Sequence, residues 1–179
     1  IKLCYDMGYI VDAKGEATKM AICFFIGHRD TPDTVLPALA AEVERHIMEY
    51  GVTDFVVGHY GRFDALAAKA VMDAKKRHPT VTLTILLPYH PAERTVDIPP
   101  GFDGTLYPPG METAPKRLAI LRADHYMVEH STPLIAYVAH PSAGSRQVLE
   151  EALRRQKRGL TRVTNLADEW KEEGRWAEK

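Results

Sequence analysis

Cysteine is scarce in this sequence of 179 residues, which contains only Cys4 and Cys23. Two cysteines form no disulfide framework, and their spacing matches no zinc-ligand motif. Cys23 is expected to pack as a small apolar residue in a buried strand. No apolar run is long enough to span a bilayer. A formal net charge of -1 provides no overall attraction to nucleic acid or to a membrane surface. We therefore expect a single-domain protein of the reducing cytoplasm.

Several nucleotide and hydrolase motifs are also missing. The sequence has no G-x-G-x-x-G and no Walker A pattern, which disfavours an ordinary dinucleotide or NTPase site. Ser142 and Ser145 lie near His140, but no G-x-S-x-G elbow is present, which disfavours an α/β-hydrolase.

Short apolar runs alternate with segments of helical period. Strands are predicted at 21–26, 52–57, 81–87, 134–138 and 160–163, and helices at 37–50, 63–77, 117–130 and 145–157. This alternation indicates βαβ units, so the predicted fold class is α/β, a three-layer Rossmann-like parallel sheet flanked by helices. The segment 89–116 is rich in Pro and Gly, which is typical of a functional stretch or of one that hides a short element.

Three parts of the chain are distinguished by their composition. Residues 1–19 show no clear period and precede Met20, a natural start codon, so we expect this leader to be dispensable for the fold. Residues 20–166 form the predicted Rossmann-like domain. Residues 167–179 are a charged C-terminal tail.

Four predicted strands each run into a polar loop that contains a histidine. These loops are 27–30, 58–64, 88–91 and 140–146. The carboxyl ends of parallel strands share one edge of the sheet, and ligands bind in the crevice outside that edge. The sequence therefore predicts one cleft surrounded by these loops.

The loop 140–146 best fits a phosphate site, because it joins a strand to a helix and is built of small residues. Its candidate ligand contacts are Ser142, Ala143, Gly144, Ser145 and Arg146. The alternative is an ordinary turn with a serine N-cap.

The loop 58–64 offers Gly58, Gly61 and Arg62 as candidate contacts for a phosphate or ribose, with Asp64 able to accept from ribose hydroxyls. Alternatively, Asp64 only stabilises the first turn of the following helix through the helix dipole.

The loop 27–30 follows the first strand and offers Gly27, His28 and Arg29 as ligand contacts. Its Asp30 is either part of the site or, like Thr31, an N-cap.

The loop histidines raise the question of a metal site. His28, His59, His90 and His140 match no local metal motif, and the neighbouring arginines would repel a cation. We therefore predict no metal and no cofactor.

From Ala21 to Val163 the sequence resembles the SLOG superfamily and, within it, the YpsA-like branch. The segments that support the resemblance are Phe25–Arg29, Gly61–Asp64, Ala67–Val71, Arg77–Pro79, Leu86–Tyr89, Arg122–Val128, Ser131 and Leu134–Tyr137. It adds Arg122 to the candidate contacts, and we include Tyr89 with them.

The resemblance implies a Rossmann-like fold and a nucleotide or nucleotide-derived ligand. Some SLOG proteins, such as the LOG cytokinin-activating enzymes, cleave N-glycosidic bonds of nucleoside monophosphates. Others bind DNA, as DprA does, or are thought to sense signalling nucleotides in bacterial defence. LOG enzymes contain Pro-Gly-Gly-x-Gly-Thr-x-x-Glu; aligning Gly144-Ser145 with the Gly-Thr pair puts Val148 in place of the glutamate.

The expected function is therefore binding of a nucleotide-derived small molecule for sensing or sequestration. The alternative is an N-glycosidase with Asp64 or Asp30 as its carboxylate, and DNA binding is a lesser alternative. SLOG relatives often assemble, so a homo-oligomer is expected, with Tyr126 and Met127 facing the partner.

Overall fold

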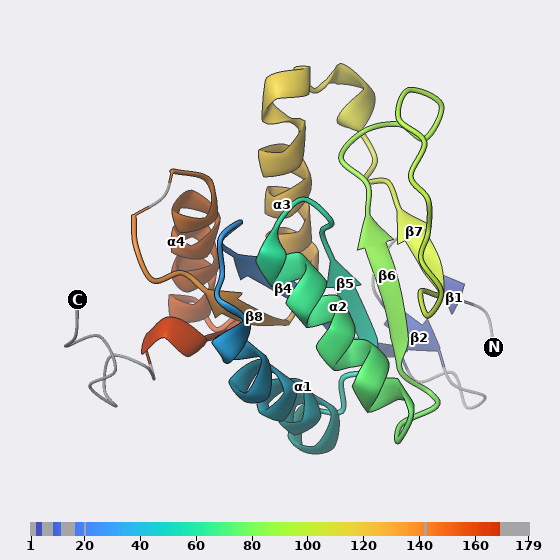
Figure 1. The fold of residues 1–179 in the computed structure, drawn as a ribbon. Coiled ribbons are helices and arrows are strands. Elements are labelled where there is room, and N and C mark those ends of the chain that lie inside the picture. The colour runs from blue at the N-terminus through green and yellow to red at the C-terminus, as the bar shows by residue number, and fades with distance from the viewer. Residues whose placement is uncertain (1–2, 5–8, 12–16, 20, 142, 169–179) are drawn as a thin grey trace.

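The computed structural model describes residues 3–4, 9–11, 17–19, 21–141 and 143–168 (Figure 1). Its main element is a six-stranded, all-parallel sheet with the order β7-β6-β5-β4-β8-β9. The strands are β4 (Ile22–Gly27), β5 (Asp54–Val57), β6 (Thr82–Leu86), β7 (Gly104–Leu106), β8 (Pro133–Tyr137) and β9 (Arg162–Asn165).

Helices cover both faces of this sheet (Figure 1). They are α1 (Leu36–Tyr50), α2 (Arg62–Lys75), α3 (Ala119–His130) and α4 (Ala143–Lys157). Short 3₁₀ turns are η1 (Asp33–Val35), η2 (Met111–Thr113) and η3 (Lys116–Leu118). The predicted three-layer Rossmann-like fold is confirmed.

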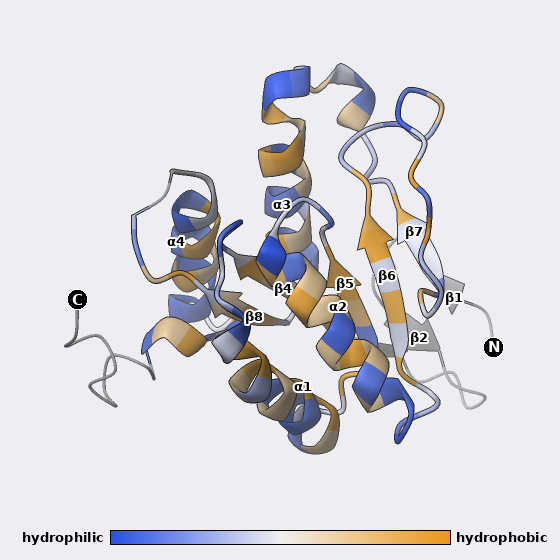
Figure 2. Cartoon of the chain, in the orientation of Figure 1, coloured by the Kyte–Doolittle hydropathy of each residue, from blue (hydrophilic) through white to orange (hydrophobic). Residues whose placement is uncertain are grey.

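The two cores follow from the alternation of side chains along each strand. Phe25 and Phe55 face α1 and α2 and stack with their ring centroids 6.0 Å apart. Phe24 and Val56 face α3 and α4. Figure 2 shows the central strands as largely hydrophobic, as expected for parallel strands covered on both sides. Cys23 is buried there as predicted.

The strand order places a topological switch point beside β4. From β4 the chain moves outward through β5 and β6 to β7, and then returns to β8 on the other side of β4. Ligands of open α/β sheets bind where the order reverses, outside the carboxyl ends of the strands. The loops after β4, β5 and β8 therefore surround the expected crevice.

Most elements lie within a few residues of their predicted bounds. The segment 89–116 does hide a short element, β7, whose Leu106 carbonyl accepts from the Leu87 amide at 2.7 Å. In α3 the buried stripe consists of Ala119, Ala123 and Met127, so the expectation that Met127 faces a partner is wrong. Leu118, just before α3, is 44% exposed.

The leader contains three strands that its sequence did not predict. β1 (Leu3–Cys4), β2 (Tyr9–Val11) and β3 (Ala17–Lys19) form an antiparallel sheet separate from the main one. The dispensability of the leader stays a prediction. At the other end Ala167 is still buried, and 169–179, most of the predicted tail, lies outside the described residues. Among the described helices, none has the length and apolarity needed to cross a membrane.

Candidate functional site

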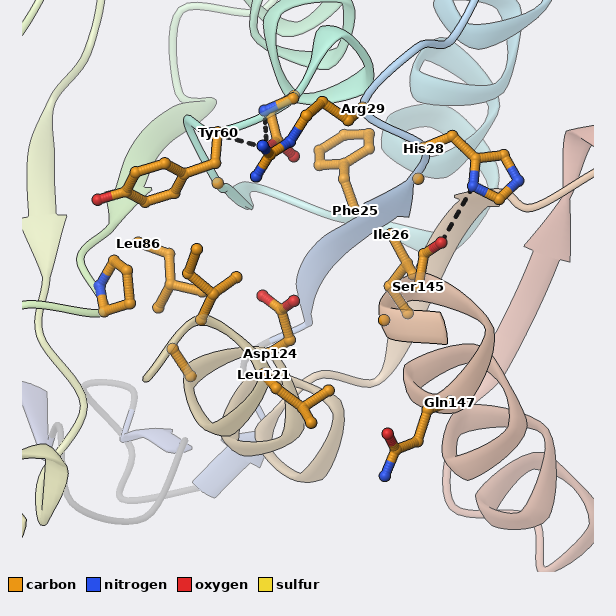
Figure 3. A pocket seen from close by; sticks show the side chains of 18 of the residues that line it. Phe25, Ile26, His28, Arg29, Tyr60, Leu86, Leu121, Asp124, Ser145 and Gln147 are labelled. Carbon is orange, nitrogen blue, oxygen red and sulfur yellow. Dashed lines mark hydrogen bonds between the residues drawn. The ribbon is translucent and has the colours of Figure 1, made fainter. Parts of the chain in front are cut away.

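A cavity of about 500 Å³ lies at the carboxyl edge of the sheet, within the size range of small-molecule sites (Figure 3). The loops after β4, β5 and β6, the η3–α3 segment and the first turns of α4 enclose it. Its lining comprises Phe25, Ile26, Gly27, His28, Arg29, Gly58, Tyr60, Gly61, Asp64, Leu86, Pro88, Arg117, Leu118, Ile120, Leu121, Ala123, Asp124, Gly144, Ser145 and Gln147.

The structure brings all four predicted loops to this cavity, with Pro88 as the contribution of the loop 88–91. The candidates that line it are Gly27, His28, Arg29, Gly58, Gly61, Asp64, Gly144 and Ser145. Ser142 lies outside the described residues, and only the backbone of Ala143 is described.

Other candidates are not part of the lining. Arg62 forms a bidentate ion pair with Asp33, with both N···O distances 2.7 Å. Arg146 pairs with Glu150 one turn along α4 at 3.0 Å. Asp30 is exposed, 3.9 Å from Nε2 of His140.

Two further candidates also lie outside the lining. The Tyr89 hydroxyl donates to the Lys116 carbonyl at 3.2 Å, and Arg94 lies over the Tyr89 ring. Arg122 is exposed on α3.

His28 connects the end of β4 to the β8–α4 loop. Its Nε2 accepts from the backbone amides of Ala139 at 2.9 Å and His140 at 3.3 Å, so Nε2 carries no proton. Nδ1 then carries the proton and donates to Oγ of Ser145 at 3.1 Å (Figure 3). Burial, followed by the nearby His140, lowers the pKa of His28, which agrees with a neutral ring. His28 therefore positions the first turn of α4, and its lone pair is not available as a base for Ser145.

Three possible metal ligands meet beside this loop. Ligand atoms of His28, Asp30 and His140 lie within 4.8 Å of one another. However, both His28 nitrogens already have protein partners, and the His140 ring stacks on that of His28 with centroids 3.8 Å apart. A metal ion would have to break these contacts, so the cluster does not fit a metal site.

Asp64 lies at the start of α2 and has two roles. Its Oδ2 accepts from the amides of Tyr60 and Gly61, each at 3.2 Å, so the proposed stabilisation of the first turn is correct. The side chain also lines the cavity. Burial raises the pKa of Asp64 to about 6, although the two amides and Arg29 act in the opposite direction.

Asp124 is the residue that the sequence interpretation missed. It projects from α3 into the cavity (Figure 3). Its carboxyl group has no hydrogen bond or ion pair within the described part of the chain. Burial, and then the negative charge of Asp64, raise the pKa of Asp124 well above its ordinary value. Two carboxyl groups from different helices thus influence each other within one cavity.

Helical spacing provides a signal that was available in the sequence. Arg117, Ile120, Leu121 and Asp124 follow an i, i+3, i+4, i+7 pattern and all line the cavity. This stripe lies beside the buried stripe of α3.

The remaining walls are of two kinds. Leu86 and Leu121 provide apolar surface, and Tyr60 adds an aromatic side chain (Figure 3). Pro88 adds further apolar surface. The first turn of α4 provides helix N–H groups that have no acceptor within the helix, together with the positive end of the helix dipole. The cavity therefore combines a helix N-terminus, which is favourable to negative charge, with apolar walls.

No protein-family model matches the chain, and no curated protein sequence matches it. Two solved structures of the molybdenum cofactor carrier protein from Chlamydomonas reinhardtii are similar to it. One is 20% identical over 83% of this chain and 76% of its own, with a TM-score of 0.49. The other is 17% identical over 80% of this chain and 89% of its own, also with a TM-score of 0.49. Similarity at this level says nothing about the ligand.

Proposed function

We propose that the chain binds a nucleotide or nucleotide-derived small molecule in the cavity, with a phosphate at the first turn of α4. The main support is the placement of Gly144 and Ser145, which line the cavity at the N-terminal end of α4. Backbone amides and the dipole at such a helix end stabilise an anion. His28 holds this turn beside the end of β4, so the anion site does not depend on a freely moving loop.

The glycine in this turn also fits a closely bound phosphate. A Cβ built on Gly144 would meet no atom within 4 Å, so packing within the chain does not require a glycine here. Glycine in a helix costs about 0.5–1 kcal/mol relative to alanine. An open approach to the backbone explains why this cost is tolerated.

The test uses the Gly144→Asp variant, which adds bulk and negative charge at the proposed phosphate. Native mass spectrometry of the purified protein identifies any co-purified ligand, and titration calorimetry with that ligand or with nucleoside 5′-monophosphates measures affinity. Gly144→Asp should abolish binding while unfolding stays cooperative. Ala41→Asp adds the same charge at an exposed position of α1 and should bind normally. Unchanged affinity in Gly144→Asp would refute the phosphate position.

A second candidate is hydrolysis of an N-glycosidic bond. Water would cleave the bond between the base and C1′, giving the protonated free base and ribose 5-phosphate. The observation that favours it is Asp64, a cavity carboxyl group whose pKa of about 6 suits proton transfer near neutral pH. Val148, at the position of the LOG glutamate, is fully buried and provides no carboxylate.

The enzymatic reading predicts that Asp64→Asn lowers turnover by about 100-fold or more while binding persists. Asp30→Asn is the matched control, because Asp30 is exposed and outside the cavity lining. Chromatographic assay of free base from nucleoside monophosphates measures both. If turnover is seen and Asp64→Asn leaves it unaffected, this mechanism is wrong, and no turnover at all favours binding alone.

A further inference from the structure

The unpartnered carboxyl group of Asp124 indicates what the other end of the ligand contains. Asp124 is partly buried, so a ligand that fills the cavity would withdraw its carboxyl group from water, and an unmet buried polar group costs about 1–3 kcal/mol. Asp124 points into the cavity and forms no hydrogen bond with any described residue. A bound molecule would provide the missing partner.

Asp64 offers a second, complementary group in the same cavity. Its Oδ2 is used by the amides of Tyr60 and Gly61, whereas Oδ1 accepts no hydrogen bond from the described residues. Two carboxyl groups that influence each other do not both ionise readily, so one keeps its proton. Burial and the charge of Asp64 raise the pKa of Asp124 well above its ordinary value, which favours Asp124 as the member that keeps its proton and Asp64 as the acceptor.

This combination of one O–H donor and one carboxylate acceptor selects among ligand groups. A phosphate is repelled by Asp64. A cation is disfavoured because Arg29 and Arg117 line the same cavity. Neighbouring hydroxyl groups fit both members, since each hydroxyl can donate and accept.

We propose that Asp124 and Asp64 together bind the ribose hydroxyls of the ligand, so that the cavity selects ribonucleotides over their deoxy counterparts. This inference rests on the proposed function, which places the phosphate at α4 and the sugar between the helix end and the two carboxyl groups. It makes Asp124 a specificity-determining residue of the site.

The experiment compares affinities by titration calorimetry. The probes are the four ribonucleoside 5′-monophosphates, their 2′-deoxy and 3′-deoxy counterparts, ribose 5-phosphate and inorganic phosphate. The wild type should bind at least one ribonucleotide about tenfold more tightly than its deoxy forms, because losing the hydroxyl leaves a site group unpaired.

Variants of Asp124 then test whether its carboxyl group binds a ribose hydroxyl. Asp124→Ala should lower affinity for the ribonucleotide and for ribose 5-phosphate about tenfold and abolish the ribose preference, with little effect on inorganic phosphate. Asp124→Asn should stay within about threefold of the wild type, because its amide keeps one donor and one acceptor. Glu129→Ala removes an exposed carboxylate from the same helix and serves as the control. Asp64 is left intact because it also caps α2.

Each other outcome overturns the inference in a recognisable way. If ribo and deoxy forms bind equally and Asp124→Ala changes nothing, the proposed function stands and the inference is wrong. If Asp124→Asn is as damaging as Asp124→Ala, the group acts by its charge and does not bind hydroxyls as a neutral acid. If no probe binds the wild type, the proposed function and the inference fail together.

Discussion

His28 offers the most direct test of how this site is held in place. Its Nε2 accepts from the amides of Ala139 and His140, and its Nδ1 donates to Ser145. His28→Leu removes all three contacts while keeping an apolar side chain of similar bulk. His28→Gln keeps an acceptor at the end of the side chain and loses the contact with Ser145. The pair of variants therefore separates the backbone contacts from the serine contact.

The size of the effect follows from the orphaned amides. His140 is exposed and its amide can bind water, so the cost comes mainly from the part-buried amide of Ala139, at about 1–3 kcal/mol for one unmet donor. In a domain of this size each kcal/mol lowers the melting temperature by roughly 2–4 °C, so His28→Leu should melt roughly 2–12 °C below the wild type. The melting temperature of His28→Gln should lie between those of His28→Leu and the wild type. Both variants should also bind nucleoside monophosphates more weakly, because the first turn of α4 is no longer fixed.

The pH dependence has a defined sign. Because the pKa of His28 is lowered in the folded state, the unfolded chain takes up this proton first as pH falls below about 6.5. The free energy of unfolding therefore rises with pH in that window and is lost on acidification. Asp64 acts in the opposite sense, because its raised pKa of about 6 favours the folded state at low pH. His140, Asp30 and the Tyr137 ring also face His28.

Thermal unfolding of the wild type and His28→Leu between pH 5 and 8 isolates the contribution of His28 to the pH dependence of stability. Contributions such as that of Asp64 are shared and cancel in the difference between the two curves. The wild-type advantage should shrink as pH falls below about 6.5. If the two proteins melt together, or if their difference is independent of pH, His28 does not position this loop as described.

The other predictions are tested by thermal melting and calorimetry. Gly27→Ala should destabilise the fold by about 1–3 kcal/mol or more, because the added Cβ would lie 2.2 Å from the Phe63 ring; a melting temperature equal to that of the wild type would contradict this packing. Gly144→Ala should melt at or slightly above the wild-type temperature, because its Cβ meets only open space within the chain. The same Cβ should weaken nucleotide binding, because it would stand where the phosphate approaches the backbone; unchanged affinity would argue against a close phosphate. Deletion of residues 1–19 should change affinity little and the melting temperature by less than about 5 °C; a larger fall would mean that the leader packs on the domain.

The fold was accessible from the sequence because its signals are local. Short β-branched runs, helical periods and the stop at Gly51, which adopts a left-handed conformation with φ 64°, each depend on neighbouring residues only. The strand order was not predicted beyond a parallel sheet, because it depends on which strands pair at long range. β7 was not predicted as a strand, because its three residues are too few to show a period.

The site was predicted at the level of loops but less well at the level of side chains. Arg62 and Arg146 look like phosphate ligands in the sequence, yet each has a carboxylate partner in the structure. Asp33 is 29 residues from Arg62, a pairing that loop composition cannot reveal. Asp124 could not be predicted from the rule that ligands bind at strand ends, because it lies on a helix.

The roles of the glycines likewise cannot be predicted from the sequence. A Cβ on Gly27 would collide with Phe63, and one on Gly58 would lie 2.8 Å from Oδ2 of Asp64. Close packing within the chain therefore explains these two glycines without any ligand. Gly144 has no such neighbour. All three lie where a strand leads into a helix, so only the folded structure distinguishes their roles.

The two ends of the cavity differ in charge, and this difference constrains how a ligand lies in it. The first turn of α4 attracts an anion through its amides and dipole. The Asp64 carboxylate, at the start of α2, repels one, and Asp124 lines the same cavity with a pKa raised well above its ordinary value. With the phosphate in its proposed position at α4, the uncharged part of the ligand extends toward the carboxyl groups and the apolar walls. A nucleoside 5′-monophosphate, the ligand proposed above, has this arrangement of an anionic end followed by a hydroxylated and a flat part.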